Sequence, residues 1–391
     1  MSSYYYPLIG GTMMATSVYH LLYYNGKVLG ISGIYGGAIS DVIDSIRRSF
    51  ATSRSAKQVT AQFRSETDSL SDDSVALATR NSKIEKGENN EATGSRWKVS
   101  FVVGLLAGGT LLRLAQAPLE IRLGIPIFEK SVIQGVSVSP LASVLSGLLV
   151  GIGTKVIRGL RLYTKIKLSK GCTSGHMLCG VSRLSLRSIV ATTTFFASAV
   201  GTVRLLNPQT SIPTILQKPF DPLAILLLQI PLVVYRYIVP IISAGKWYEP
   251  VSSFFISVHF AFALALAGML QPSKIQNFLL LPFSSNFDPA LLSVAVGALV
   301  PLLLGWVIKL RSTEKPLFKV QFNLPSHDEI DCKLIVGAVF FGIGWGWTGI
   351  CPGSGVVNFG AYAEQWRTIG AWLLGMTGGQ LLVSRGLVGI S

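Results

Sequence analysis

Two thiols and an imidazole lie within ten residues of each other in the segment KGCTSGHMLCGVSRLSLR, residues 170–187. These side chains are Cys172, His176 and Cys179. Gly171 precedes them, and three small or hydroxyl-bearing residues stand between Cys172 and His176, namely Thr173, Ser174 and Gly175. A second glycine-rich stretch, GICPGSGVVNFG at residues 349–360, contains Cys351, Pro352 and Gly353. Glycine lets the backbone turn sharply and approach a ligand closely, so both stretches are candidate binding turns.

A metal site is one chemistry that these residue types can support. Cys172, His176 and Cys179 have spacings of four and three, which would place them on one face of a helix. A tetrahedral site needs a fourth ligand, and the segment offers none nearby. Gly175 and Gly180 also argue against a regular helix there. We therefore expect no metal at this segment and no other cofactor.

Anion binding is the chemistry that fits better. A helix that begins inside a membrane presents unpaired N–H groups and a positive dipole end. Hydroxyls, a thiol and an imidazole add donors with few formal charges, which suits an ion that must enter and also leave. A lone cysteine is often only a small buried apolar residue, and Cys332 fits that interpretation. Cys172 and Cys351 differ because each lies in a glycine turn, and Cys179 is intermediate.

The composition predicts where such turns would be placed. The chain has 391 residues, of which 49% are hydrophobic and only 14% charged, with a mean hydropathy of +0.50. A soluble domain carries nearer a quarter charged residues. Long apolar runs with few charges indicate an all-α polytopic integral membrane protein, and their continuity speaks against a β-barrel.

The net charge of +15 would suggest nucleic acid as a partner in a soluble protein. Here the cations lie mostly in short segments between apolar runs, as the positive-inside rule expects. We therefore expect the lipid bilayer, and not nucleic acid, as the partner. An anionic substrate would be a second reason for the excess.

The apolar runs predict about nine spanning helices. They cover residues 4–24, 99–114, 140–153, 188–203, 221–239, 251–269, 289–308, 332–347 and 367–383. Residues 45–98 are polar, almost free of aromatic residues and mixed in charge, and we interpret them as a disordered insertion.

Four short elements interrupt these runs, at residues 25–42, 170–187, 268–281 and 349–360. The first contains Ser32 and Gly33, and we expect its turn near Gly30–Gly37. The elements fall at corresponding places in two halves, residues 1–206 and 251–391, joined by a connector and linking helix at 207–250. Paired broken segments are typical of a transporter with a binding site at the bilayer midplane.

The same elements carry a family resemblance. GCTSGHMLCGVSRLSLRS resembles the signature of the YeeE/YedE sulfur-transport membrane proteins, and GIGWGWTGICPGSG resembles the second-half motif of their relatives. LGISGIYGG and GMLQPSKIQNFLLL are similar to the two other short elements. The resemblance implies an hourglass-shaped protein with pseudo-two-fold halves, which occur as separate paired proteins in bacteria and would be fused here.

The resemblance also implies a function and its residues. It implies uptake of thiosulfate, contacted in succession by cysteine thiols, and only Cys172 and Cys351 match the motif cysteines. Ser32 stands where the bacterial importers have a further cysteine, and Cys179 is a candidate substitute. Sulfur-carrier proteins are candidate partners, and the plasma membrane is the expected location.

We thus expect a transporter of thiosulfate or a related sulfur-containing anion, and not an enzyme. Two alternatives stay open. One is a membrane enzyme that carries a persulfide on Cys172 or Cys179, with His176 or a helix N-terminus lowering the pKa of the thiol. The other is a channel for a neutral species such as hydrogen sulfide.

Overall fold

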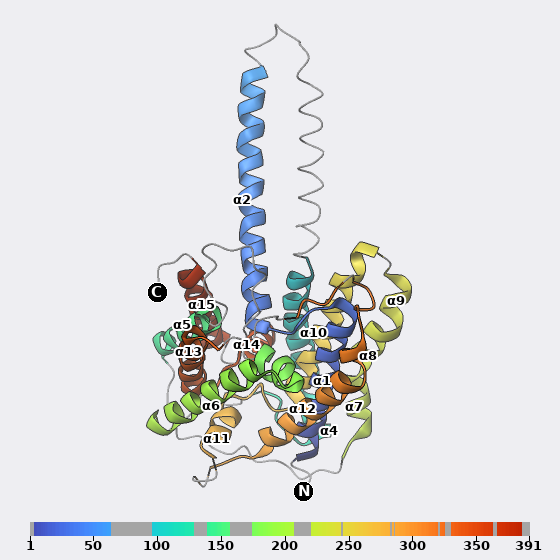
Figure 1. Cartoon of the computed structure of the whole chain (residues 1–391), viewed down its shortest axis with the longest axis vertical. Helices are drawn as coiled ribbons and strands as arrows, with labels where there is room; N and C mark the ends of the chain where they lie inside the picture. The colour runs from blue at the N-terminus through green and yellow to red at the C-terminus, as the bar shows by residue number, and fades with distance from the viewer. Residues whose placement is uncertain are drawn as a thin grey trace.

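A computed structural model of the chain describes residues 4–63, 96–128, 139–156, 174–206, 220–243, 245–281, 284, 286–319, 321–324, 330–362 and 366–384. Within these ranges the secondary structure is helical and contains no β-strand (Figure 1). The expected all-α polytopic class is confirmed. Gly171, Cys172 and Thr173 lie outside the described residues.

The helices of the first part of the chain are α1 (Tyr5–Asn25), α2 (Ile31–Phe63), the Arg96–Leu114 helix, α4 (Gln116–Leu123), α5 (Pro140–Val156), the π-helical turn η2 (Gly175–Gly180), the 3₁₀ turn η3 (Val181–Arg183) and α6 (Leu186–Leu206). A bent segment follows, made of α7 (Pro222–Leu228), α8 (Ile230–Val233), η4 (Val234–Ile238) and α9 (Val239–Ile242). The remaining helices are α10 (Tyr248–Leu266), α11 (Pro272–Leu279), α12 (Ala290–Ile308), α13 (Cys332–Thr348), α14 (Pro352–Gly360) and α15 (Trp366–Ser384).

Fewer of these helices are long and apolar enough to cross a membrane than the nine expected. Among the described residues four spans satisfy both conditions: Arg96–Leu114, α6, α10 and Ala290–Ser312, which contains α12 and the short turn after it. Two bent pairs, Pro222–Leu228 with Ile230–Ile242 and Cys332–Thr348 with Pro352–Gly360, raise the number to six. The α5 helix is apolar but has only 17 residues. The expected ranges of α1 and α15 are helical, but tyrosines in α1 and glycines in α15 lower their hydropathy.

The helices form two tightly packed groups. In one group α5 packs against α13 and α15, and α6 packs against α13. In the other, α1 packs against α10 and α12, and the Arg96–Leu114 helix lies on α10. Glycines allow the close approach: a Cβ on Gly147 would lie 2.0 Å from the carbonyl oxygen of Trp372 in α15. Each group therefore combines helices from both ends of the sequence.

The contacts between elements also repeat in pairs. Exchanging α1 with α10, α5 with α13, and α6 with α15 converts the α6–α13 contact into the α15–α5 contact. The short elements follow the same rule when η2 is exchanged with α14 and α2 with α11. The contact of α14 with α15 then corresponds to that of η2 with α6, and the contact of α11 with α13 to that of α2 with α5. The contact of α10 with α14 corresponds to that of α1 with η2. All of these contacts occur. The short elements thus have equivalent neighbours at the two ends of the chain.

Three local expectations are wrong. The first break lies at residues 26–30, before the expected turn, and Gly33, Gly36 and Gly37 belong to α2. Residues 45–63, the first part of the expected insertion, continue α2 as a helix. Cys332 is exposed at the start of α13 rather than buried, because Asp331 caps that helix at the protein surface.

Candidate functional site

The foot of α2 and the start of α14 lie side by side in the middle of the helical body (Figure 1). Both helices begin directly after a break in the chain. The four breaks are residues 26–30, the turn that includes Ser174 and η2, residues 267–271, and residues 349–351. They join helices from both packing groups, so contacts between them define where the groups meet.

Three of these elements meet at Ile31, the first residue of α2. The backbone N–H of Ile31 donates a hydrogen bond to the Ser174 hydroxyl at 3.2 Å. A Cβ added to Gly353 in α14 would lie 2.7 Å from Ile31 Cδ1. Gly353 therefore leaves room for the end of the Ile31 side chain. The structure thus brings together the elements that carry Ser32, Ser174 and Cys351, and their role in binding a substrate stays a prediction.

The break at residues 349–351, which precedes α14, lies against the start of α11. Gly349 has a φ of +68°, and a Cβ there would lie 2.4 Å from the carbonyl oxygen of Pro272. Asn358 Nδ2 of α14 donates to the Leu270 carbonyl at 2.9 Å, and Gln276 Nε2 of α11 donates to the Trp347 carbonyl at 3.0 Å. These bonds satisfy backbone carbonyls that the breaks leave without helical partners.

Cys351 is the N-cap residue of α14. Its thiol accepts from the backbone N–H of Ser354, and its own backbone N–H donates to the Ser354 hydroxyl at 3.1 Å. Pro352 occupies the first helical position, where its missing N–H costs nothing. The thiol is half-buried, so a sulfur atom stands at the positive end of a helix.

Ser32 and Gly33 lie in the first turn of α2, and both are buried. The carbonyl of Ser32 accepts a hydrogen bond from Gln380 Nε2 of α15 at 3.1 Å. A Cβ on Gly36 would lie 2.0 Å from Gln380 Oε1, so this glycine admits the glutamine side chain. The foot of α2 is therefore held from three sides, by α14, α15 and the Ser174 turn.

The predicted residues after Ser174 serve packing in this structure. His176 Nδ1 pairs with the Ser188 hydroxyl of α6 at 2.9 Å, while its Nε2 is buried without a hydrogen-bond partner among the described residues. Cys179 is 2% exposed and belongs to the hydrophobic core. Gly175, like both of these, is buried in η2. A contact between any of them and a substrate stays a prediction.

Among the described residues no three His, Cys, Asp or Glu side chains gather as a metal site would require. Cys172 is not described, so neither the metal alternative nor a pairing of Cys172 with Cys351 is tested. Asp221 and Glu364 are isolated acids in the sequence, and the structure describes only Asp221. Asp221 caps α7, and the N–H of Ala224 holds the pKa of its carboxyl below the usual range. Glu364 lies outside the described residues.

Sequence reasoning missed a set of buried polar side chains on the short elements and beside them. They are Gln271, Ser273, Lys274, Gln276, Asn277, Asn358 and Gln380. Four polar residues in the eight-residue PSKIQNFL helix were the available signal, because an apolar packing element would not carry them. Among them, Asn358, Gln276 and Gln380 donate hydrogen bonds to backbone carbonyls at or beside the breaks.

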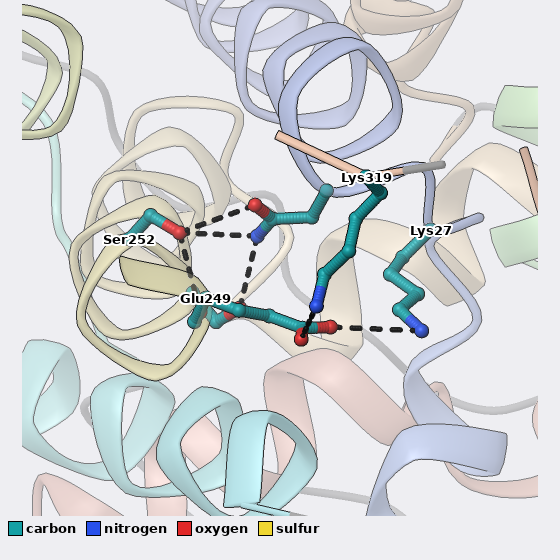
Figure 2. A network of polar contacts seen from close by, with 6 residues as sticks. Lys27, Glu249, Ser252 and Lys319 are labelled. Carbon is teal, nitrogen blue, oxygen red and sulfur yellow. Dashed lines mark hydrogen bonds and ion pairs between the residues drawn. The ribbon is translucent and has the colours of Figure 1, made fainter. Parts of the chain in front are cut away.

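A charged cluster holds Lys27, a residue of the first break, against the start of α10 (Figure 2). The buried Glu249 carboxylate of α10 pairs with Lys27 at 3.5 Å and with Lys319 at 2.5 Å. Lys27 follows the left-handed residue Gly26, and its ammonium also faces the ring of Trp97 at 5.4 Å. Burial lowers the pKa of the Lys27 ammonium, and the Glu249 carboxylate opposes that shift.

Comparisons with known proteins find a family of unknown function and relatives named as probable transporters. Residues 249–385 match DUF6691, a family of unknown function. A probable transporter of Xylella fastidiosa strain 9a5c is 37% identical over 99 residues, which are 25% of this chain and 66% of that protein. A second probable transporter of the same strain is 28% identical over 207 residues, 53% of this chain and 98% of that protein. No solved structure matches.

These relatives and the architecture support one general conclusion. The chain is similar to transporters. The chain covers just under two thirds of the first of these relatives. Four to six spans among its described residues are long and apolar enough to cross a bilayer. Together the findings support an integral membrane protein with similarity to probable transporters.

Proposed function

We propose that this protein takes up thiosulfate or a related small sulfur-containing anion at the place where the four breaks meet. The observation that carries the proposal is the Cys351 thiol, which caps α14 beside the start of α11 and the foot of α2. A thiol donates only a weak hydrogen bond, so it can hold a sulfur-containing anion without trapping it.

The surroundings of the thiol suit a negative charge. The helices α2, α11 and α14 all begin at the breaks, and each helix start presents N–H groups and a positive dipole end. No acidic residue occurs in the first turn of any of the three. In this proposal Cys172 faces Cys351, and Ser32 takes the place of a third thiol. Gly171, Thr173, Ser174, Gly175, His176, Gly33, Pro352 and Gly353 line the same path.

A fusion of two related halves also belongs to the proposal. The repeated contacts between elements support it, since each short element has equivalent neighbours in the other part of the chain. Two probable transporters of one strain are similar to this chain over 99 and 207 residues, and they are separate proteins. The cell membrane is the proposed location.

The test is uptake of labelled thiosulfate by cells that express the protein. Cys351→Ala and Cys172→Ala should each slow uptake roughly threefold or more, because each removes one weak thiol hydrogen bond to the anion. Cys332→Ala is the matched control, because Cys332 is an exposed thiol away from the breaks, and it should transport normally. Uptake that is unchanged in Cys351→Ala, at equal protein level, contradicts the proposal.

Mass spectrometry of the protein after exposure to thiosulfate separates transport from the enzyme alternative. Unmodified cysteines agree with transport. A covalent sulfur adduct on a cysteine would indicate the persulfide-carrying enzyme instead.

A further inference from the structure

Lys274 is a buried lysine in the first turn of α11. Its side chain is 7% exposed. The Lys274 side chain folds back over the turn that precedes α11, because a Cβ added to Gly268 would lie 2.8 Å from Lys274 Cδ and 2.9 Å from Lys274 Nζ. Gly268, with a φ of +72°, therefore leaves room for the ammonium group.

This ammonium has no ion-pair partner among the described residues, unlike Lys27, Lys98 and Lys319. Asp288 is near enough to attract it but makes no ion pair with it. Burying an unpaired charge is costly, so such groups in membrane proteins normally have a function.

The position in the helix raises the cost further. Lys274 is the third residue of α11, where the helix dipole repels a cation. Gln271 caps this helix without a side-chain hydrogen bond, and its first turn contains no acid. Burial, helix position and the missing carboxylate all disfavour a cation here, and a bound anion would compensate for all three.

The Cys351 turn lies at the same end of α11. Gly349 packs directly against Pro272, two residues before Lys274, and Asn358 of α14 bonds to Leu270 just before α11. The equivalent position of α2, its third residue, is Gly33. The cation therefore occurs at only one of these two related helix starts.

We propose that Lys274 binds the transported anion by direct charge pairing at the start of α11, on the Cys351 side of the path. This inference rests on the proposed function, because it names the residue that supplies the positive charge at that site. Its ligand class is a small inorganic oxyanion or thioanion, with thiosulfate and sulfate as the probes.

The first experiment measures anion binding by the thermal midpoint of the full chain in detergent. Thiosulfate should raise the midpoint of the unmodified protein saturably, and chloride at equal ionic strength should not. Lys274→Met should weaken the apparent affinity by on the order of 10-fold or more. The same variant should unfold at an equal or higher temperature without anion, since an unpaired buried charge has been removed.

Two further variants control the result. Lys274→Arg keeps the charge and should retain part of the binding, whereas Lys315→Met removes an exposed lysine and should behave like the unmodified protein. If Lys274→Met cannot be purified, Lys274→Gln carries the same test because it keeps a donor without the charge. A saturable shift of unchanged affinity in Lys274→Met overturns the inference.

The outcomes also separate this inference from the proposed function. Sulfate binding that depends on Lys274, without thiosulfate binding, supports Lys274 and refutes thiosulfate as substrate. Thiosulfate uptake at the normal rate in Lys274→Met supports the proposed function and refutes Lys274. Failure of both anions to stabilise the unmodified protein overturns the inference, as does stabilisation by phosphatidylglycerol alone, which would identify a lipid headgroup.

Discussion

The starts of α2 and α11 are built alike but differ in charge. Each follows a break, each has a buried serine as its second residue, Ser32 or Ser273, and each lies against a helix of the other packing group. At the third residue α2 has Gly33 and α11 has the buried Lys274. The comparison teaches that a repeated backbone frame can carry chemically unequal ends, one neutral and one charged.

The largest expected effect tests the packing around the start of α11. Gly349→Ala should destabilise the protein by roughly 3 kcal/mol or more, because the residue is left-handed and its Cβ would meet the Pro272 backbone. Gly268→Ala has the same backbone strain but meets only the flexible Lys274 side chain, so it should cost less. Thermal unfolding in detergent measures both.

Gly378→Ala is the control for these glycine variants, since nothing lies within 4 Å of its added Cβ in α15. It should be neutral or slightly stabilising, as alanine favours a helix. Equal costs for Gly349→Ala and Gly268→Ala would show that the backbone contact is unimportant.

The next effect concerns the charged cluster that holds the first break. Glu249→Gln should cost about 2–3 kcal/mol, because it leaves Lys27 and Lys319 without their carboxylate. Asp41→Asn removes the more exposed pair with Lys98 and should cost about 1 kcal/mol or less. Chemical or thermal unfolding of the two variants decides, and the reverse order would contradict the assigned role of Glu249.

Much of this arrangement could be predicted from the sequence. The apolar runs located the helices because hydropathy reports directly on membrane solvation. The helix of residues 45–63 was missed because its polar composition resembles that of a disordered segment. The first break was misplaced because glycines 33, 36 and 37 serve helix packing instead of a turn. Lys274 and Gln380 were missed because burial depends on contacts with distant parts of the chain.

Two glutamines offer a test of intermediate size. Gln380→Leu removes the bond to the Ser32 carbonyl, and Gln276→Leu removes the bond to the Trp347 carbonyl. Each should cost about 1–2 kcal/mol, the penalty of an unsatisfied buried carbonyl. Unfolding midpoints should fall by similar amounts, and a loss confined to one variant would show that the two breaks are unequally supported.

The smallest effect tests Ser32 at the start of α2, the helix start without a buried charge. Ser32→Ala should slow thiosulfate uptake roughly threefold, since it removes one uncharged hydroxyl worth less than about 1 kcal/mol. Ser32→Cys, which restores a thiol, should retain uptake. Labelled uptake at equal protein level measures both, and a loss as large as that of Lys274→Met would mean that the two ends are not chemically unequal.

The length of α2 acts as a ruler for depth in the membrane. From Ile31 to the Asp41–Lys98 pair the helix rises roughly 15 Å, about half of a hydrocarbon layer near 30 Å thick. Beyond Asp41 most of its described side chains are exposed to the surroundings of the protein body. If that ion pair marks the water boundary, Ile31 would lie near the midplane. Under the proposed function, an anion arriving from this side would then reach the breaks after crossing only half of the electrical barrier.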